Sequence, residues 1–129
     1  MTYILDTHTL VWYVSTDPRL SPLAQAVMDN PLSEFVVPTM VLVEIQFLNA
    51  KKRFSTDLST VYTDFIEAKN CTVYPLNEKV VSKIPTGLDI HDAIITATAL
   101  VYRDLFHQAV TLITKDGKIT QSGLIQTLW

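Results

Sequence analysis

The sequence predicts an α/β fold: a mainly parallel β-sheet flanked by α-helices on both faces, in a single domain over residues 1–129. Short apolar runs bounded by polar residues, typical of buried strands, alternate with longer stretches of helical spacing. This alternation favours βαβ units and therefore parallel strands. The chain has 129 residues, of which 48% are hydrophobic and 18% charged. Such a length and composition indicate one globular domain with a substantial core.

The N-terminal segment predicts one strand and two helices. Residues 1–6 contain an apolar run that leads directly into an acid, as expected of a buried strand and its exit. Residues 7–14 place apolar side chains at helical spacing, with Thr7 or Thr9 available as the N-cap. A second helix over residues 22–29 begins with serine at the cap and proline in the first turn.

The next segment repeats the pattern. Residues 35–37 predict a second short buried strand, which Pro38 ends because it lacks a backbone N–H. Residues 39–50 predict a mostly apolar helix. Residues 57–69 predict another helix, since their apolar side chains gather on one side.

The remaining segment has the same alternation, with shorter strands. Its predicted elements are a strand over 72–74, a helix over 77–84, a helix from 89 or 91 to 106, a strand over 110–114 and a weaker strand over 124–128. Between the last two strands, Asp116-Gly117 predicts a turn. These patterns predict whether a segment is a helix or a strand better than they predict where it begins and ends.

Composition excludes several classes of protein. The formal net charge is −3, which argues against a broad basic surface that binds nucleic acid by charge alone. A polyanionic substrate is not excluded, because bound cations would neutralise clustered acids. No apolar run approaches the roughly 18 residues of a membrane span, and no signal peptide is recognised. The single cysteine, Cys71, cannot form an internal disulfide, so we expect a reduced thiol and a cytoplasmic location.

Glu44 is out of place in its helix. Its neighbours at spacings of three and four include Met40, Val41, Phe47 and Leu48, so it lies on an apolar face. A carboxylate on such a face is costly to bury unless it is paired or binds a metal ion. The alternative is an exposed acid that pairs with Lys51 or another base.

Three further acids adjoin apolar core segments. Asp92 opens a helix that is apolar or small all round, and Asp89 precedes it by three residues; alternatively, both acids simply favour the positive first turn. Asp6 and Asp116 each follow a predicted strand, where open α/β sheets bind ligands. Asp6 could instead cap the first helix, and Asp116 could belong only to its turn.

Taken together, the four acids Asp6, Glu44, Asp92 and Asp116 predict a metal site. Clustered carboxylates repel one another and need cations to stay ionised, and oxygen-only ligands suit Mg²⁺ or Mn²⁺. Such ions activate water and stabilise the attacking and leaving oxygens in phosphodiester hydrolysis. The hydroxyls of Thr7 and Thr114 lie beside these acids in the sequence, where they can hold a ligand or a metal-bound water.

Other chemistries fit less well. The chain contains no Gly-x-Ser-x-Gly elbow, no phosphate-binding Gly-rich loop and no triad pattern around its cysteine. The histidines His8, His91 and His107 lack the spacing of a zinc site. His8 and His91 flank the acids, so either could contact a substrate, although such residues are more often solvated or locally bonded.

Four motifs follow one another along the chain: Ile4-Leu5-Asp6-Thr7, Glu44 within an apolar helix, Asp89-x-x-Asp92-Ala93-x-Ile95-x-Ala97-x-Ala99, and Leu112-x-Thr114-x-Asp116. With these motifs the sequence resembles the PIN-domain nucleases, and in length and motif order the VapC-type toxins of toxin–antitoxin pairs. The resemblance covers essentially the whole chain. Each motif alone is weak, but the four in this order are fairly specific.

The resemblance implies a PIN-like fold and a Mg²⁺- or Mn²⁺-dependent endoribonuclease. The family's core acids correspond to Asp6, Glu44, Asp92 and Asp116, its hydroxyl residue to Thr114, and an auxiliary acid to Asp89. It also implies an RNA substrate, a cognate antitoxin protein and a homodimer. A departure from the family pattern is His91, which stands where a small or apolar residue is usual.

Two alternatives to this function are a non-catalytic PIN-like module that binds RNA or protein, and a DNA-directed metal nuclease. Intact acids count against the first, and the sequence barely distinguishes the second from a ribonuclease. The candidate RNA-binding residues are Lys51, Lys52, Arg53, Lys115 and Lys118. For the first three, the alternative is a solvated helix end.

Overall fold

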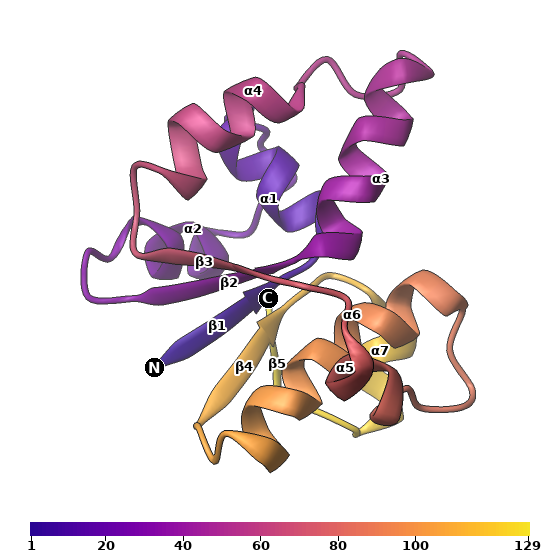
Figure 1. The fold of residues 1–129 in the computed structure, drawn as a ribbon. Coiled ribbons are helices and arrows are strands. Elements are labelled where there is room, and N and C mark those ends of the chain that lie inside the picture. Colours follow the sequence, from indigo (N-terminus) through magenta and orange to yellow (C-terminus); the bar gives the residue numbers. More distant parts are fainter.

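A computed structural model describes residues 1–129 (Figure 1). Its centre is a five-stranded sheet in the order β3-β2-β1-β4-β5, in which every neighbouring pair is parallel. The strands are β1 (Thr2–Leu5), β2 (Glu34–Pro38), β3 (Cys71–Tyr74), β4 (Val110–Ile113) and β5 (Thr127–Leu128). The predicted α/β class is confirmed, and the sheet is wholly parallel.

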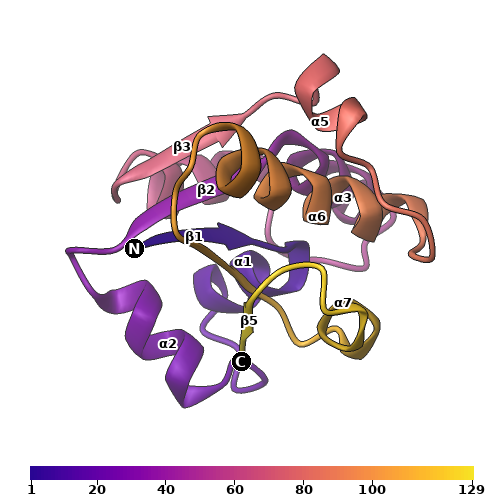
Figure 2. The ribbon, with the colours of Figure 1, turned by 90° about the horizontal axis from the view of Figure 1, so that it is seen from below.

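Helices cover both faces of the sheet. They are α1 (Thr7–Val14), α2 (Pro22–Asp29), α3 (Thr39–Ala50), α4 (Leu58–Val61), α5 (Glu78–Ser82), α6 (Ile90–Leu100) and α7 (Gly117–Ser122). Two π-helical segments, η1 (Tyr62–Ile66) and η2 (Val101–Leu105), continue α4 and α6. Figure 1 shows α1, α2 and α4 on one side of the sheet and α5 and α6 on the other. Figure 2, seen from below, shows α6 in front of the sheet and α1 behind it.

The sheet is buried on both faces, which explains why the strand sequences are mostly apolar and do not alternate between apolar and polar residues. All four residues of β4 are buried, including Thr111. In α6 every residue from Ala93 to Leu100 is buried, because small alanine and threonine side chains let the helix pack closely against its neighbours. This tightly packed helix carries Asp92 in its first turn.

The structure corrects two details of the predicted elements. Asp6, rather than Thr7 or Thr9, caps α1: its side chain accepts a hydrogen bond from the Thr9 backbone N–H. The Asp116-Gly117 pair opens a helix, α7, instead of forming only a turn. Ile119 is the buried residue of α7, so the segment has no apolar periodicity that would predict a helix.

The C-terminal parts of two predicted helices also differ from regular α-helix. The segments 62–66 and 101–105 are π-helical, a local widening that side-chain spacing does not reveal. Elsewhere the agreement is close, and α1 and α3 have the predicted bounds. The structure contains no helix with the length and apolarity that crossing a bilayer requires.

Candidate active site

The topology brings four acids from four elements to one edge of the sheet. Asp6 follows β1, and Asp116 lies just beyond β4, which pairs with β1 in parallel register from Thr2 with Val110 to Leu5 with Ile113. Neighbouring parallel strands end at the same edge, so the residues after them lie close together. Glu44 comes from α3 and Asp92 from the first turn of α6, and these two helices pack together.

Asp6 is held by two elements. One carboxylate oxygen accepts a hydrogen bond from the backbone N–H of Thr9, at 2.9 Å, and so caps α1. The other oxygen accepts a hydrogen bond from the Thr114 hydroxyl. Burial raises the pKa of Asp6, and the hydrogen bonds from Thr114 and Thr9 partly oppose that rise. The capping role and a role in a polar site therefore coexist in this residue.

Thr114 links the acids that follow the two central strands. Its buried hydroxyl donates to Asp6 and accepts a hydrogen bond from the backbone N–H of Asp116, at 3.0 Å. One carboxylate oxygen of Asp116, Oδ1, accepts hydrogen bonds from the backbone N–H groups of Lys118 (2.8 Å) and Ile119 (3.1 Å). Asp116 thus caps α7 with Oδ1, which leaves its Oδ2 available for another partner.

Glu44 is directed toward the other site residues rather than toward the basic end of its own helix. Its Oε1 accepts a 2.8 Å hydrogen bond from the hydroxyl of Thr7. Its Oε2 lies 3.5 Å from Nδ1 of His91, in α6. Lys51, the base considered from the sequence, instead places its amine 4.5 Å from the centre of the Phe47 ring. His91 therefore contacts the site through Glu44.

Asp92 is the acid whose pKa reflects all the other carboxylates of the group. Its pKa is raised from 3.8 to about 6, first by burial and then by repulsion from Asp116, Glu44, Asp89 and Asp6, in that order. The five carboxylates therefore share one electrostatic environment. Asp89 occupies the N-cap position of α6 and is exposed, but its side chain makes no capping hydrogen bond.

The acids converge without forming a complete chelating group. No three of the chain's histidine, cysteine, aspartate or glutamate side chains are arranged so that they could hold one metal ion directly. The donors are nevertheless all carboxylate and hydroxyl oxygens, the ligand type of Mg²⁺ and Mn²⁺. Their mutual repulsion at Asp92 is the electrostatic condition that a cation would relieve.

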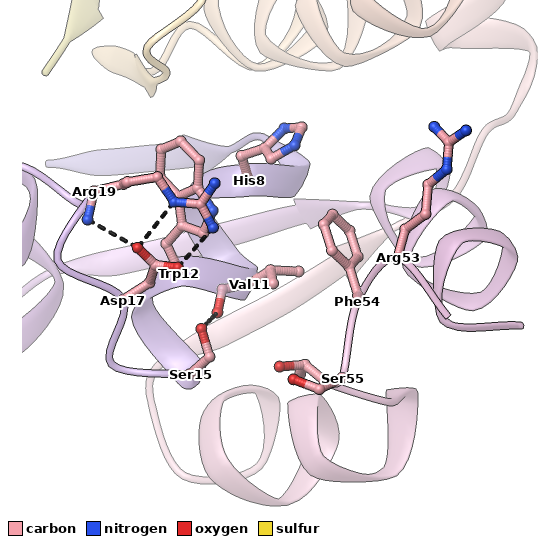
Figure 3. Close-up of a pocket in the computed structure, with 10 residues that line it drawn as sticks. His8, Val11, Trp12, Ser15, Asp17, Arg19, Arg53, Phe54 and Ser55 are labelled. Carbon is pink, nitrogen blue, oxygen red and sulfur yellow. Dashed lines mark hydrogen bonds and ion pairs between the residues drawn. The ribbon is translucent and has the colours of Figure 1, made fainter. Parts of the chain in front are cut away.

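The basic candidates do not form one patch. Lys51 and Lys52 are exposed at the end of α3. Arg53 lines a cavity together with His8 (Figure 3). The amine of Lys115 lies 5.8 Å from the centre of the Trp12 ring, which lines the same cavity. The sequence does not single out three other residues of this cavity, Trp12, Arg19 and Phe54, because they lie in separate segments and form no motif.

The fold and the acidic edge define a parallel α/β protein with an electronegative site at the carboxyl ends of its strands. Residues 3–122 match the family model of the PIN domain. The chain therefore belongs to the PIN-domain family, whose members are nucleases. A search of curated proteins found no match.

Solved structures support the same fold over nearly the full chain. A structure of VapBC2 from Rickettsia felis, bound to a DNA fragment from the promoter, has a TM-score of 0.65 at 15% identity and covers 99% of this chain and 98% of its own. A structure of VapBC-1 from nontypeable Haemophilus influenzae has a TM-score of 0.64 at 18% identity, with 99% and 97% covered. At these identities the likeness concerns the fold.

Proposed function

We propose that this chain is a metal-dependent endoribonuclease and the toxin of a toxin–antitoxin pair. The observation that carries the proposal is the convergence of acids on Asp92, whose pKa is raised to about 6 by burial and by four neighbouring carboxylates. Strongly perturbed pKa values with specific charged neighbours cluster at functional sites. Membership of a nuclease family supplies the reaction class.

The proposed metal ligands are the four core acids Asp6, Glu44, Asp92 and Asp116, which would hold Mg²⁺ or Mn²⁺ directly or through waters. PIN nucleases generally use divalent metal ions. When bound, such an ion lowers the pKa of a coordinated water and stabilises negative charge on the phosphodiester oxygens.

The protein's own contribution is to orient these acids before substrate arrives. Thr114 fixes the direction of the Asp6 carboxylate and the backbone position of Asp116. Thr7 holds one oxygen of Glu44, and His91 lies against the other. Asp89 adds negative charge at the exposed rim. Oriented carboxylates avoid reorganisation during the reaction.

The partner proposals have a separate basis. The two solved structures described above, which share the fold, are of VapBC proteins, and the sequence motifs resemble VapC-type toxins. An antitoxin protein and a homodimeric state are proposed on that basis. RNA rather than DNA is proposed as the substrate from the same resemblance, and parallel digestion of RNA and single-stranded DNA would decide between them.

The decisive experiment is digestion of total RNA by the purified chain with Mg²⁺, with Mn²⁺ or with EDTA. We expect discrete fragments that disappear with EDTA and in the Asp92→Asn variant. The matched control is Asp64→Asn, which changes an exposed acid on η1 outside the acidic group and should leave cleavage intact. Cleavage by Asp92→Asn at the wild-type rate would refute the proposed site. A folded chain that cuts neither RNA nor DNA and gains no thermal stability from either ion would favour the binding module.

A further inference from the structure

A group of aromatic and cationic side chains surrounds a cavity of about 180 Å³. One wall is α1, with His8 and Trp12, and the other is the segment after α3, with Arg53 and Phe54. Arg19 lies at one end (Figure 3). We call this cavity the α1 pocket. Its volume is comparable to that of a roughly 150 Å³ cavity that accepts a benzene ring, so one aromatic ring fits.

The α1 pocket adjoins the acidic site at two points. His8 is two residues from Asp6, the N-cap of the same helix. Lys115 lies between Thr114 and Asp116 and places its amine 5.8 Å from the centre of the Trp12 ring. A polymer with one phosphate at the acids therefore has its neighbouring unit close to the pocket.

The rings of the pocket have different accessibility. Trp12 is only 8% exposed, because Arg19, at 4.8 Å from its centre, and Trp129, at 5.9 Å, pack against it. Trp12 is therefore the floor. His8 is exposed and Phe54 is half-buried, and their rings meet edge to face with 5.6 Å between centres and an interplanar angle of 89°. The His8 ring also packs against Trp12, with 5.3 Å between centres and an interplanar angle of 57°, so His8 stands between Trp12 and Phe54. The exposed parts of the His8 and Phe54 rings are the surface on which a further aromatic ring can pack, in the tilted or offset arrangements that aromatic groups prefer.

The charges of the pocket favour an anion beside that ring. Arg19 is neutralised by Asp17, whose two oxygens lie 3.0 Å and 2.7 Å from the guanidinium nitrogens. Arg53 is exposed and makes no ion pair, so its guanidinium is available for a phosphate. Ser15 donates its hydroxyl proton to the Val11 carbonyl at 2.8 Å, which leaves its oxygen able to accept a hydrogen bond from a base N–H.

We propose that the α1 pocket is a nucleobase subsite, in which a base of single-stranded RNA beside the scissile phosphate stacks on His8 and Phe54 while Arg53 binds a backbone phosphate. The inference rests on the proposed ribonuclease function and adds the residues that position the substrate. Stacking on aromatic side chains, combined with phosphate contacts, is the general way in which proteins bind single strands. It would give this acidic chain affinity for RNA without a broad basic surface.

The test is equilibrium binding of a fluorescently labelled oligouridylate, followed by anisotropy in EDTA so that no cleavage intervenes. A second probe is an abasic oligomer of the same length, which keeps the phosphates and lacks the bases. The stacking variants are His8→Ala and Phe54→Leu, the latter because leucine keeps apolar volume in the partly buried position. His8→Phe keeps an aromatic ring at residue 8 and so tests stacking apart from the imidazole. Arg53→Gln removes the proposed phosphate contact. Lys79→Gln, on α5, is the control.

We expect His8→Ala and Phe54→Leu each to weaken oligouridylate binding about tenfold, within the range for loss of one stacked base, and to leave binding of the abasic oligomer unchanged. His8→Phe should bind as the wild type does. Arg53→Gln should weaken binding of both probes, and Lys79→Gln should change neither. Melting temperatures of all variants establish that each is folded.

The inference is overturned if folded His8→Ala and Phe54→Leu bind oligouridylate as tightly as the wild type, or lose affinity equally for the abasic oligomer. It is also overturned if they retain RNA binding and lose only a protein partner, since the pocket would then be a protein site. The nuclease proposal fails separately. If the chain cleaves RNA with a metal ion but the pocket variants bind RNA normally, only the subsite proposal is refuted. If binding depends on the bases but no RNA is cleaved, only the nuclease proposal is refuted.

Discussion

The hydroxyl of Thr7 donates a 2.8 Å hydrogen bond to Oε1 of Glu44. This contact joins the first residue of α1 to the middle of α3, 37 positions along the chain. Thr7 is buried, and the Glu44 side chain is 21% exposed, so water competes poorly for the bond. The N-terminal turn of α1 therefore sets the direction of an acid on another helix.

Replacing Thr7 by valine should lower kcat/KM for RNA about tenfold, because a hydrogen bond to a charged group is worth roughly 1.5–3 kcal/mol. The shape of the side chain is kept, while Glu44 loses its donor. Thr7→Ser retains the donor and should stay within a few-fold of wild type. Single-turnover cleavage of one RNA by the three proteins measures the effect, and equal rates for valine and wild type would show that the bond has no role in positioning.

Asp92→Asn should raise the melting temperature in metal-free buffer while abolishing cleavage. The pKa of Asp92 is about 6 in the folded chain and 3.8 in the reference state. The folded state therefore binds this proton more tightly, and stability falls as pH rises between these two values. Asparagine has no such titration, so its advantage should be present above pH 6 and fade toward acid. Because the carboxylate is partly exposed, we expect only a few degrees.

Thermal scans of wild type and Asp92→Asn over a series of pH values measure this difference. The exposed-site variant Asp64→Asn is the control and should show no such pH dependence. A variant less stable than the wild type above pH 6 would mean that Asp92 is stabilised by a contact which outweighs the repulsion from its neighbours.

Divalent cations should stabilise the wild-type chain. Binding to the folded state alone raises the free energy of unfolding with ligand concentration, and relief of carboxylate repulsion contributes to the affinity of that binding. The melting temperature should therefore rise with Mg²⁺ and return to its starting value after EDTA. Asp92→Asn should respond less, and the same concentration of K⁺ serves as the ionic-strength control. An identical response of both proteins to Mg²⁺ would place the ion elsewhere.

Cys71 should react slowly with iodoacetamide in the folded chain. Burial raises the pKa of its thiol to about 12, so very little of the reactive thiolate is present at neutral pH. Unfolding in urea removes the burial, and the rate should then rise to that of an ordinary cysteine. Mass spectrometry of the alkylated protein against time gives both rates, and comparable rates in the two conditions would contradict the burial of the thiol.

The sequence was informative wherever short-range pattern determines structure. Helices α1 and α3 have the predicted bounds, because caps, prolines and apolar spacing act within a few residues. Glu44 stood out as a candidate site residue because a charge on an apolar helix face is a local conflict. Asp116-Gly117 was ambiguous, since the same pair suits a turn and the start of α7.

Contacts between residues far apart in the chain could not be predicted from such short-range patterns. The hydrogen bond from Thr114 to Asp6 spans 108 positions. The sequence predicted that both residues belong to one candidate site, but not that they are in contact. The α1 pocket combines Trp12, Arg19 and Phe54 from three segments, none of which carries a motif. Their association depends on how α1 packs against the segment after α3, which only the tertiary structure reveals.

The position of β1 at the centre of the sheet also bears on synthesis of the protein at the ribosome. One neighbour of β1 is β2, which follows soon after it, but the other is β4, near residue 110. Thr114 and Asp116 arrive only with that same late segment. A nascent chain whose residues 110–116 have not yet emerged from the ribosome has β1 paired with β2 but not with β4. It also lacks Thr114 and Asp116 of the acidic site. Nuclease activity should therefore appear only after residues 110–116 have emerged, and in a single step.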